Sequence, residues 1–145
     1  MQDVPDGFGR HSRKSPVTDH WEPLYVRREE ERVALGFRLA QSHCNARGML
    51  HGGVIAALAD NAMGLTLGAA LSLRGTHETS VSIVTTTLTV DYIQAAAIGQ
   101  WVSMEPRIIG IGKNSGVVDA LVRADGEIIA RANASFRILP KQPAA

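Results

Sequence analysis

The residues best suited to chemistry lie between Asn45 and Asp60, where two adjacent glycines precede a lone acid. Gly52 and Gly53 begin a long run with the composition of a helix, although a glycine inside a helix costs about 1 kcal/mol relative to alanine. The first N–H groups of a helix have no internal acceptor and lie at the positive end of its dipole. Because glycine has no Cβ, a carbonyl oxygen could approach these donors, as in an oxyanion hole. Close packing of the helix start against a neighbouring backbone accounts for the glycines equally well.

Asp60 is the second candidate, because it is the only carboxylate between Arg32 and His77 and interrupts an apolar run. Burying a carboxylate without a partner is costly, so an acid in such a helix is a candidate general base or nucleophile. The alternative is a structural aspartate that accepts a hydrogen bond from a hydroxyl or a backbone N–H. Steps of four residues place Asp60 in a stripe of small residues, with room for a ligand or a second chain beside it. The other members of the stripe are Gly52, Ala56, Gly64 and Gly68.

The spacing of the two candidates predicts how they could act together. Eight residues separate Gly52 from Asp60, which is about 12 Å along the axis of an α-helix. Groups that act on one carbonyl must approach it to about 3–3.5 Å. If both act on the same carbonyl, they belong to different protomers, related by a two-fold axis that makes the helices antiparallel. The sequence therefore predicts at least a homodimer.

A chain of 145 residues must hold these groups within one domain. Its 45% hydrophobic and 20% charged residues are typical of a globular protein. The run 54–73 predicts a helix that is apolar on nearly every side and therefore buried. Short apolar runs on both sides of a charged cluster predict a hairpin, and four later runs predict an antiparallel meander. The hairpin covers 24–26 and 33–37, and the later strands cover 81–93, 101–111, 116–124 and 128–139. The expected fold class is α+β, with an antiparallel sheet wrapped around one long central helix.

The ends of the chain differ from its middle. Residues 1–19 hold glycine, proline and charge with little to bury, so we predict a mobile arm, a domain over 20–140 and a tail over 141–145. The net charge is +1 without a basic stripe, which argues against nucleic acid as a partner. Asp60 at the centre of the apolar run argues against a membrane span. The first twenty residues show no apolar secretion signal, so a cytoplasmic protein is expected.

The segment that holds both candidates resembles a known family. Its motif is Asn45-x-x-Gly48-x-x-His51-Gly52-Gly53, followed by Asp60. This motif is similar to the signature of the hotdog-fold acyl-CoA thioesterases, in particular the PaaI-type branch of phenylacetate degradation. The order of the predicted elements matches that family from about residue 21 to residue 139.

The resemblance implies roles for individual residues of the motif. The Gly52 N–H would bind the thioester oxygen, with Gly53 next to it at the substrate. Asp60 would be the nucleophile or the general base that activates water. Asn45 would orient the thioester or the water, and His51 would shape the loop that holds Gly52.

Two residues outside the motif are also implied by the resemblance. Many relatives place a serine or threonine beside the acid, and alignment on Tyr92 puts Thr85 there, on the same face of its strand as Thr87 and Thr89. Lys113, in a predicted hairpin turn, could contact the CoA phosphates. The segment 71–80 is longer than in shorter relatives.

These observations lead to an expected function. We expect hydrolysis of an acyl- or aryl-acyl-CoA to the free acid and CoA, because a thiol leaving group with a pKa of about 8.5 needs no strong acid. CoA would be part of the substrate, and no metal or other cofactor is expected, since His43, Cys44 and His51 lack a recognised ligand spacing. Relatives commonly pair dimers into tetramers, so a homotetramer is expected. Two alternatives stay open: a hydratase or dehydratase on a β-hydroxyacyl thioester, and a non-catalytic acyl-CoA sensor.

Overall fold

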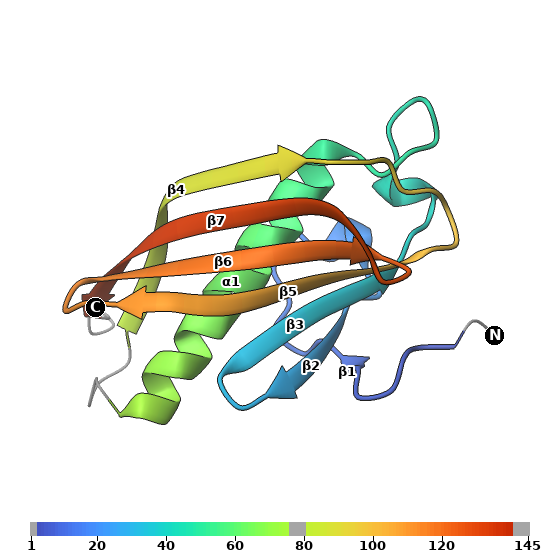
Figure 1. Ribbon diagram of the computed structural model, residues 1–145. Helices are drawn as coiled ribbons and strands as arrows, with labels where there is room; N and C mark the ends of the chain where they lie inside the picture. The colour runs from blue at the N-terminus through green and yellow to red at the C-terminus, as the bar shows by residue number, and fades with distance from the viewer. Residues whose placement is uncertain (1–2, 76–80, 141–145) are drawn as a thin grey trace.

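Antiparallel pairing joins seven strands into one sheet in the order β1-β2-β3-β5-β6-β7-β4, and the sheet curves around one long helix, α1 (Gly52–Arg74) (Figure 1). This computed structural model describes residues 3–75 and 81–140. Two short 3-10 helices, η1 (Asp19–Trp21) and η2 (Gln41–His43), lie before α1. The strands are β1 (Gly9–Arg10), β2 (Tyr25–Glu29), β3 (Arg32–Arg38), β4 (Val81–Tyr92), β5 (Trp101–Ile111), β6 (Ser115–Ala124) and β7 (Glu127–Pro140). The predicted fold class is confirmed.

The hairpin predicted before the helix is formed by β2 and β3. Val26 pairs with Leu35 and Glu29 with Arg32, so the charged cluster forms the turn and the strand ends rather than a helix. Glu30 in the turn has a positive φ of 54°. Gly36 is required where β3 passes β5, because a Cβ there would lie 2.4 Å from the Trp101 ring.

The predicted meander of four consecutive strands is wrong in one respect. β5, β6 and β7 are neighbours in sequence order, but β4 pairs with β7, from Val81 opposite Pro140 to Tyr92 opposite Ala130. The link 93–100 carries the chain across the end of the sheet and is fixed at both of its ends. The Ile93 N–H donates to the Ile129 carbonyl, and the Gly99 N–H donates to the Leu39 carbonyl, each at 2.9 Å. These bonds leave β4 at the edge and place β5 beside β3.

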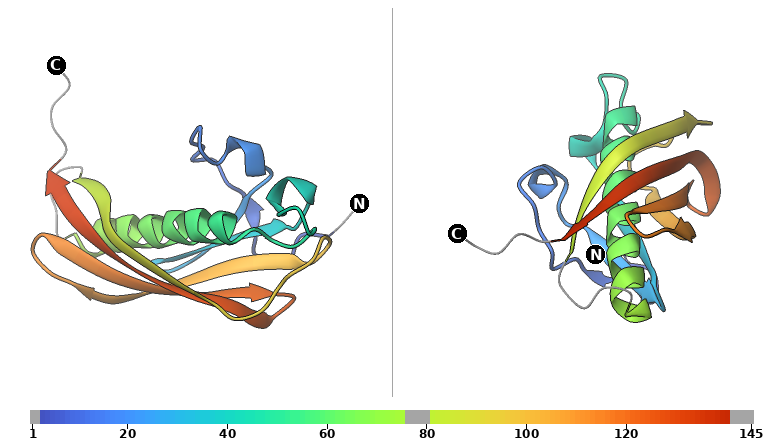
Figure 2. Two further views of the ribbon diagram at one scale, coloured as in Figure 1. Left: turned by 90° about the horizontal axis from the view of Figure 1, so that it is seen from above. Right: turned by 90° about the vertical axis from the view of Figure 1, so that its left-hand side faces the viewer.

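The core lies between α1 and the concave face of the sheet (Figure 2). Leu58, Met63 and Leu67 of α1 are fully buried there, with strand residues such as Met104 and Val122. By length and composition α1 could cross a membrane, but more than half of its most apolar stretch is buried inside the protein, as in a core helix. The sheet wraps α1 as predicted and leaves one side of the helix uncovered. The stripe residues Asp60, Gly64 and Gly68 are only half-buried, on a side of the helix that the sheet leaves open.

The described part of the predicted arm lies against the sheet. β1 pairs with β2, and the Phe8 ring packs edge-on against Trp101 at 5.2 Å between ring centroids. His11 and Thr18 are buried, so the expectation that this segment has little to bury is wrong for these two residues. Its mobility stays a prediction, and the tail 141–145 lies outside the described residues. In the segment 71–80, α1 ends at Arg74 with Gly75 in the left-handed region, and residues 76–80 lie outside the described part.

Candidate active site

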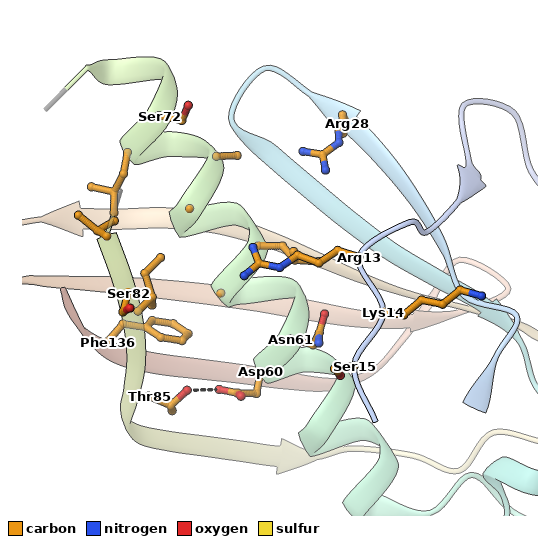
Figure 3. Close-up of a pocket in the computed structure, with 17 residues that line it drawn as sticks. Arg13, Lys14, Ser15, Arg28, Asp60, Asn61, Ser72, Ser82, Thr85 and Phe136 are labelled. Carbon is orange, nitrogen blue, oxygen red and sulfur yellow. Dashed lines mark hydrogen bonds between the residues drawn. The ribbon is translucent and has the colours of Figure 1, made fainter. Parts of the chain in front are cut away.

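Asp60 and Thr85 form a hydrogen-bonded pair between the middle of α1 and β4. The Thr85 hydroxyl donates to Asp60 Oδ1 at 2.7 Å (Figure 3). Asp60 is half-buried and lines an open cavity of about 1010 Å³. The acid is therefore neither deeply buried nor without a partner. One carboxylate oxygen accepts from Thr85, and the cavity gives a small molecule access to the acid.

A β-bulge in β4 turns Thr85 toward Asp60. Thr85 pairs with Phe136 and Thr87 with Ser135, so the register shifts by one residue between them. Residues paired across antiparallel strands share a face, and Phe136 faces inward while Ser135 is on the opposite face of β7. Thr85 thus faces α1, whereas Thr87 and Thr89 face the other side of the sheet. The prediction that the three threonines share one face is wrong, because regular alternation is interrupted at Thr86.

The start of α1 is built by its own N-cap. The His51 ring accepts a hydrogen bond at Nδ1 from the Gly53 N–H at 2.8 Å. Gly53 is therefore engaged inside the cap. The Gly52 N–H has no acceptor among residues 3–75 and 81–140, so it is the donor that the cap leaves for a ligand.

Tyr92, at the end of β4, fixes the same turn and was given no role from the sequence. Its hydroxyl donates to the Gly52 carbonyl oxygen at 2.7 Å. A Cβ on residue 52 would lie 3.1 Å from Tyr92 Cζ, so the close approach of the tyrosine ring favours glycine there. The signal was present in the sequence, as an aromatic residue at the end of a β-rich run, but such a residue is usually part of a core.

The loop that leads into the helix is stabilised by Asn45. Its Oδ1 accepts from the Arg47 and Met49 N–H groups at 2.9 and 3.1 Å, and its own N–H donates to the Met49 carbonyl at 2.8 Å. Gly48 completes this turn with a φ of 77°. Asn45 Oδ1 is thus used within the loop, and only the side-chain nitrogen is left to meet a substrate or a water.

His43 stabilises the loop before α1 through three hydrogen bonds of its ring and carbonyl. Its Nδ1 accepts from the Ala40 N–H at 2.9 Å, and its Nε2 lies 3.2 Å from the Trp21 carbonyl, to which it donates. Burial lowers the pKa of His43, which keeps the ring neutral in this arrangement. Its carbonyl accepts the His51 N–H at 2.9 Å. Within the described residues, no three His, Cys, Asp or Glu side chains gather as a metal site would require.

The structure brings together some of the expected residues and separates others. Asp60 and Thr85 share one cavity, whereas Gly52 and His51 lie at the helix start, about 12 Å away along the axis. Lys113 belongs to the turn between β5 and β6. Figures 1 and 2 show this turn near the C-terminal end of α1, away from the helix start. One protomer therefore does not place the Gly52 donor and the Asp60 acid around a single carbonyl.

Three cations at the cavity were missed by the sequence analysis. Arg13 and Lys14 from the N-terminal segment and Arg28 from β2 line the same cavity as Asp60. The sequence contains no local signal that relates these positions to Asp60, because the segment reaches the helix through tertiary contacts such as the pairing of β1 with β2.

Comparison with known proteins bears on the family of the chain. A family model described as Thioesterase superfamily matches residues 47–130, more than half of the chain. A curated relative from Pseudomonas aeruginosa, named "Putative esterase PA0474", is 27% identical over 139 residues, which cover 95% of this chain and 99% of that protein.

Solved structures share the architecture. A mutant of the phenylacetic acid degradation protein PaaI from Thermus thermophilus matches with a TM-score of 0.72 and 19% identity, over 85% of this chain and 98% of that one. A hypothetical thioesterase from Streptococcus pneumoniae, solved with coenzyme A, matches with a TM-score of 0.70 and 20% identity, over 85% of this chain and 94% of that one. The predicted hotdog fold is confirmed by these likenesses.

Proposed function

The chain belongs to the thioesterase superfamily, and from this premise we propose that it hydrolyses an acyl- or aryl-acyl-CoA to the free acid and CoA. The observation that supports this proposal most directly is the Asp60–Thr85 pair at an open cavity. A carboxylate held by one hydroxyl donor keeps its remaining lone pairs for a water molecule or for the thioester carbon. The relative solved with coenzyme A supports CoA as the thiol portion of the substrate.

In the proposed reaction Asp60 takes a proton from water as the water oxygen bonds to the thioester carbon. The negative charge on the former carbonyl oxygen is stabilised by the Gly52 N–H at the positive end of the α1 dipole. The C–S bond then breaks, and the sulfur leaves with the bonding electron pair as a thiolate. A thiol pKa of about 8.5 makes this departure possible without a strong general acid. Direct attack by Asp60 on the same carbon is the nucleophilic variant of this scheme.

The separation of Gly52 from Asp60 supports a site shared by two chains. In a two-fold dimer with antiparallel helices, Gly52 of the partner subunit would lie beside Asp60. β4 is a twelve-residue edge strand with one side free of partners among the described residues, and such an edge readily pairs with another chain. The half-buried Gly64 and Gly68 would allow the two helices to approach. We extend the proposal to a dimer of dimers, because Val84, Val117 and Leu121 expose apolar side chains on the convex face of the sheet.

We place the reaction in the cytoplasm, because a CoA thioester carries several phosphate charges and does not cross a bilayer unaided. Release of free thiol from a panel of acyl-CoA substrates tests the proposed activity. Thiol release by the wild-type chain, lost in Asp60→Asn, is the expected result. Turnover of an enoyl- or β-hydroxyacyl-CoA without thiol release would instead identify a hydratase or dehydratase. Binding without turnover would identify a sensor.

A further inference from the structure

The cavity beside Asp60 has a cationic side that the proposed chemistry does not use. Arg13 and Lys14, in the segment between β1 and η1, and Arg28, in β2, are the cationic residues among those that line it. Figure 3 shows the Arg13 side chain extending from that segment toward α1, whereas the Lys14 side chain points away from the helix. Among the described residues that line the cavity, Asp60 is the only acidic one, whereas three are cationic.

These three cations have no ion-pair partner in the part of the chain that the structure describes. Other arginines do: Arg74 lies 2.6 Å from Glu31, and Arg131 lies 2.8 Å from Asp91. None of the five ion pairs formed by the described residues includes Arg13, Lys14 or Arg28. Within the described residues, their charges are therefore not neutralised by a salt bridge.

The segment that carries Arg13 and Lys14 is anchored on both sides. Upstream, Gly9 pairs with Val26, and the His11 N–H donates to the Leu24 carbonyl at 2.9 Å. Downstream, Thr18 is 3% exposed and donates to the Ser15 carbonyl from its N–H at 3.0 Å and from its hydroxyl at 3.1 Å. Residues 12–17 thus lie between a paired strand and the buried Thr18, and the Thr18 bonds to Ser15 hold the segment in a turn.

Two of the three cations also influence the pKa of His11. Burial is the main cause that lowers the pKa of His11; Glu22 opposes it, and the charges of Arg28 and Arg13 lower the pKa further. The two arginines therefore act electrostatically on the same small region although they come from different elements.

We propose that Arg13, Lys14 and Arg28 form a subsite for an anionic group of the thioester substrate, either a carboxylate on the acyl group or a phosphate of the CoA portion. The inference rests on the proposed hydrolysis. The remainder of the cavity wall suits the uncharged part of such a substrate, because Leu65, Ile83 and Phe136 present apolar surface to it. A substrate would thus lay its apolar portion along one wall and its charge against the other, with the thioester at Asp60.

Four thioesters distinguish the two sources of negative charge. In hexanoyl-CoA the only negative charges are the CoA phosphates. Adipoyl-CoA has an acyl chain of the same length that ends in a carboxylate. The N-acetylcysteamine thioesters of hexanoate and adipate lack the phosphates. Steady-state kcat and KM for all four are measured for the wild-type chain and for the triple variant Arg13→Gln, Lys14→Gln and Arg28→Gln. Arg137→Gln is the control, because Arg137 is an exposed cation on the opposite face of the sheet.

The triple variant should lose about tenfold in kcat/KM, through KM, on the anionic substrates only. A loss on both adipoyl substrates but not on hexanoyl-CoA identifies the acyl carboxylate. A loss on both CoA substrates but on neither N-acetylcysteamine thioester identifies the phosphates. The Arg137→Gln variant should match the wild type throughout.

An equal loss on all four thioesters, or no loss on any, would overturn the subsite. If the triple variant fails to fold, the wild-type chain supplies the test. KM for an anionic substrate should rise between 50 and 500 mM salt while KM for hexanoyl-N-acetylcysteamine stays constant, and a flat response for both overturns the subsite. A wild-type chain that releases no thiol from any thioester rejects the proposed function itself, and the subsite with it.

Discussion

The start of α1 and the cavity beside Asp60 are only about two turns of one helix apart, yet they are assembled in different ways. At the helix start most contacts are local: His51 caps Gly53, and Asn45 closes the turn that ends at Met49. At Asp60 all the neighbours of interest come from distant elements, namely Thr85 from β4 and the cations from the N-terminal segment and β2. Local contacts follow from the order of residues, whereas distant ones depend on the whole topology.

The two regions also differ in how completely one chain builds them. The helix start is closed by Tyr92, whose hydroxyl holds the Gly52 carbonyl. The Asp60 cavity stays open, with half-buried glycines along its floor. The contrast indicates that the conformation of the helix start is fixed within the protomer, whereas the cavity beside Asp60 has space for a ligand or for another chain.

The largest effect is expected from Asp60→Asn, which keeps the shape of the side chain and removes its basicity. We expect kcat to fall about 100-fold or more, because a positioned general base contributes about 10²–10⁴. Asp119→Asn, an acid on β6 away from the cavity, should keep its activity, and both variants should show the circular dichroism of the wild type. Retention of more than a tenth of wild-type kcat/KM in Asp60→Asn would show that another group is the base.

Mixed dimers test whether the two regions meet across a two-fold axis. Asp60→Asn chains and Gly52→Pro chains are each expected to be inactive, since proline is tolerated at the first position of a helix but has no N–H. After subunit exchange, half of the dimers are hybrids with one intact site, so activity should return to about a quarter of the wild type. No recovery in demonstrated hybrids would put both groups in one chain.

Substitution of Thr85 tests the hydrogen bond that β4 contributes to Asp60. Thr85→Val removes the hydroxyl that donates to Asp60 Oδ1 and should lower kcat about tenfold, as expected for a hydrogen bond to a charged group. Thr85→Ser should restore most of the loss. Thr87→Val is the matched control on the other face of β4 and should behave as the wild type. Equal effects of the two valine variants would mean that the bond does not matter to turnover.

These threonines also show what the sequence could and could not predict. The helix, the strands and the candidates Gly52 and Asp60 follow from composition, periodicity and spacing, because each depends on residues close together in the chain. The inward turn of Thr85 depends on a bulge at Thr86 that local alternation does not reveal. The pairing of β4 with β7 and the approach of Arg13 to α1 depend on long connections, whose paths are set by packing rather than by their own residues.

Tyr92→Phe weakens the start of α1 and leaves Asp60 unchanged. It removes the hydroxyl that donates to the Gly52 carbonyl, so we expect kcat to fall about three- to tenfold with KM unchanged. The free energy of unfolding should fall by about 1 kcal/mol. Tyr25→Phe, at a ring packed beside Trp101, is a control for loss of a tyrosine hydroxyl elsewhere. A change in KM alone would indicate that Tyr92 contacts substrate rather than positioning the helix start.

The smallest effect is expected from pH, acting on His43 beneath the helix start. Burial lowers the pKa of His43 in the folded chain below its ordinary value of 6.5, so between these two pKa values the unfolded chain binds more protons. The free energy of unfolding should therefore fall as pH is lowered through 6.5, and the fall should end once the folded ring also takes up a proton. His11, whose pKa is also lowered, contributes in the same direction. In urea unfolding from pH 7.5 to 5.5, the free energy of unfolding should depend less on pH in His43→Gln than in the wild type. His20→Gln, at an exposed site, should leave this pH dependence unchanged.

Because the His43 carbonyl accepts the His51 N–H, protonation would loosen the cap that presents Gly52 and leave the Asp60–Thr85 pair intact. If the free energy of unfolding depends on pH in His43→Gln as it does in the wild type, the start of α1 does not depend on the neutral His43 ring.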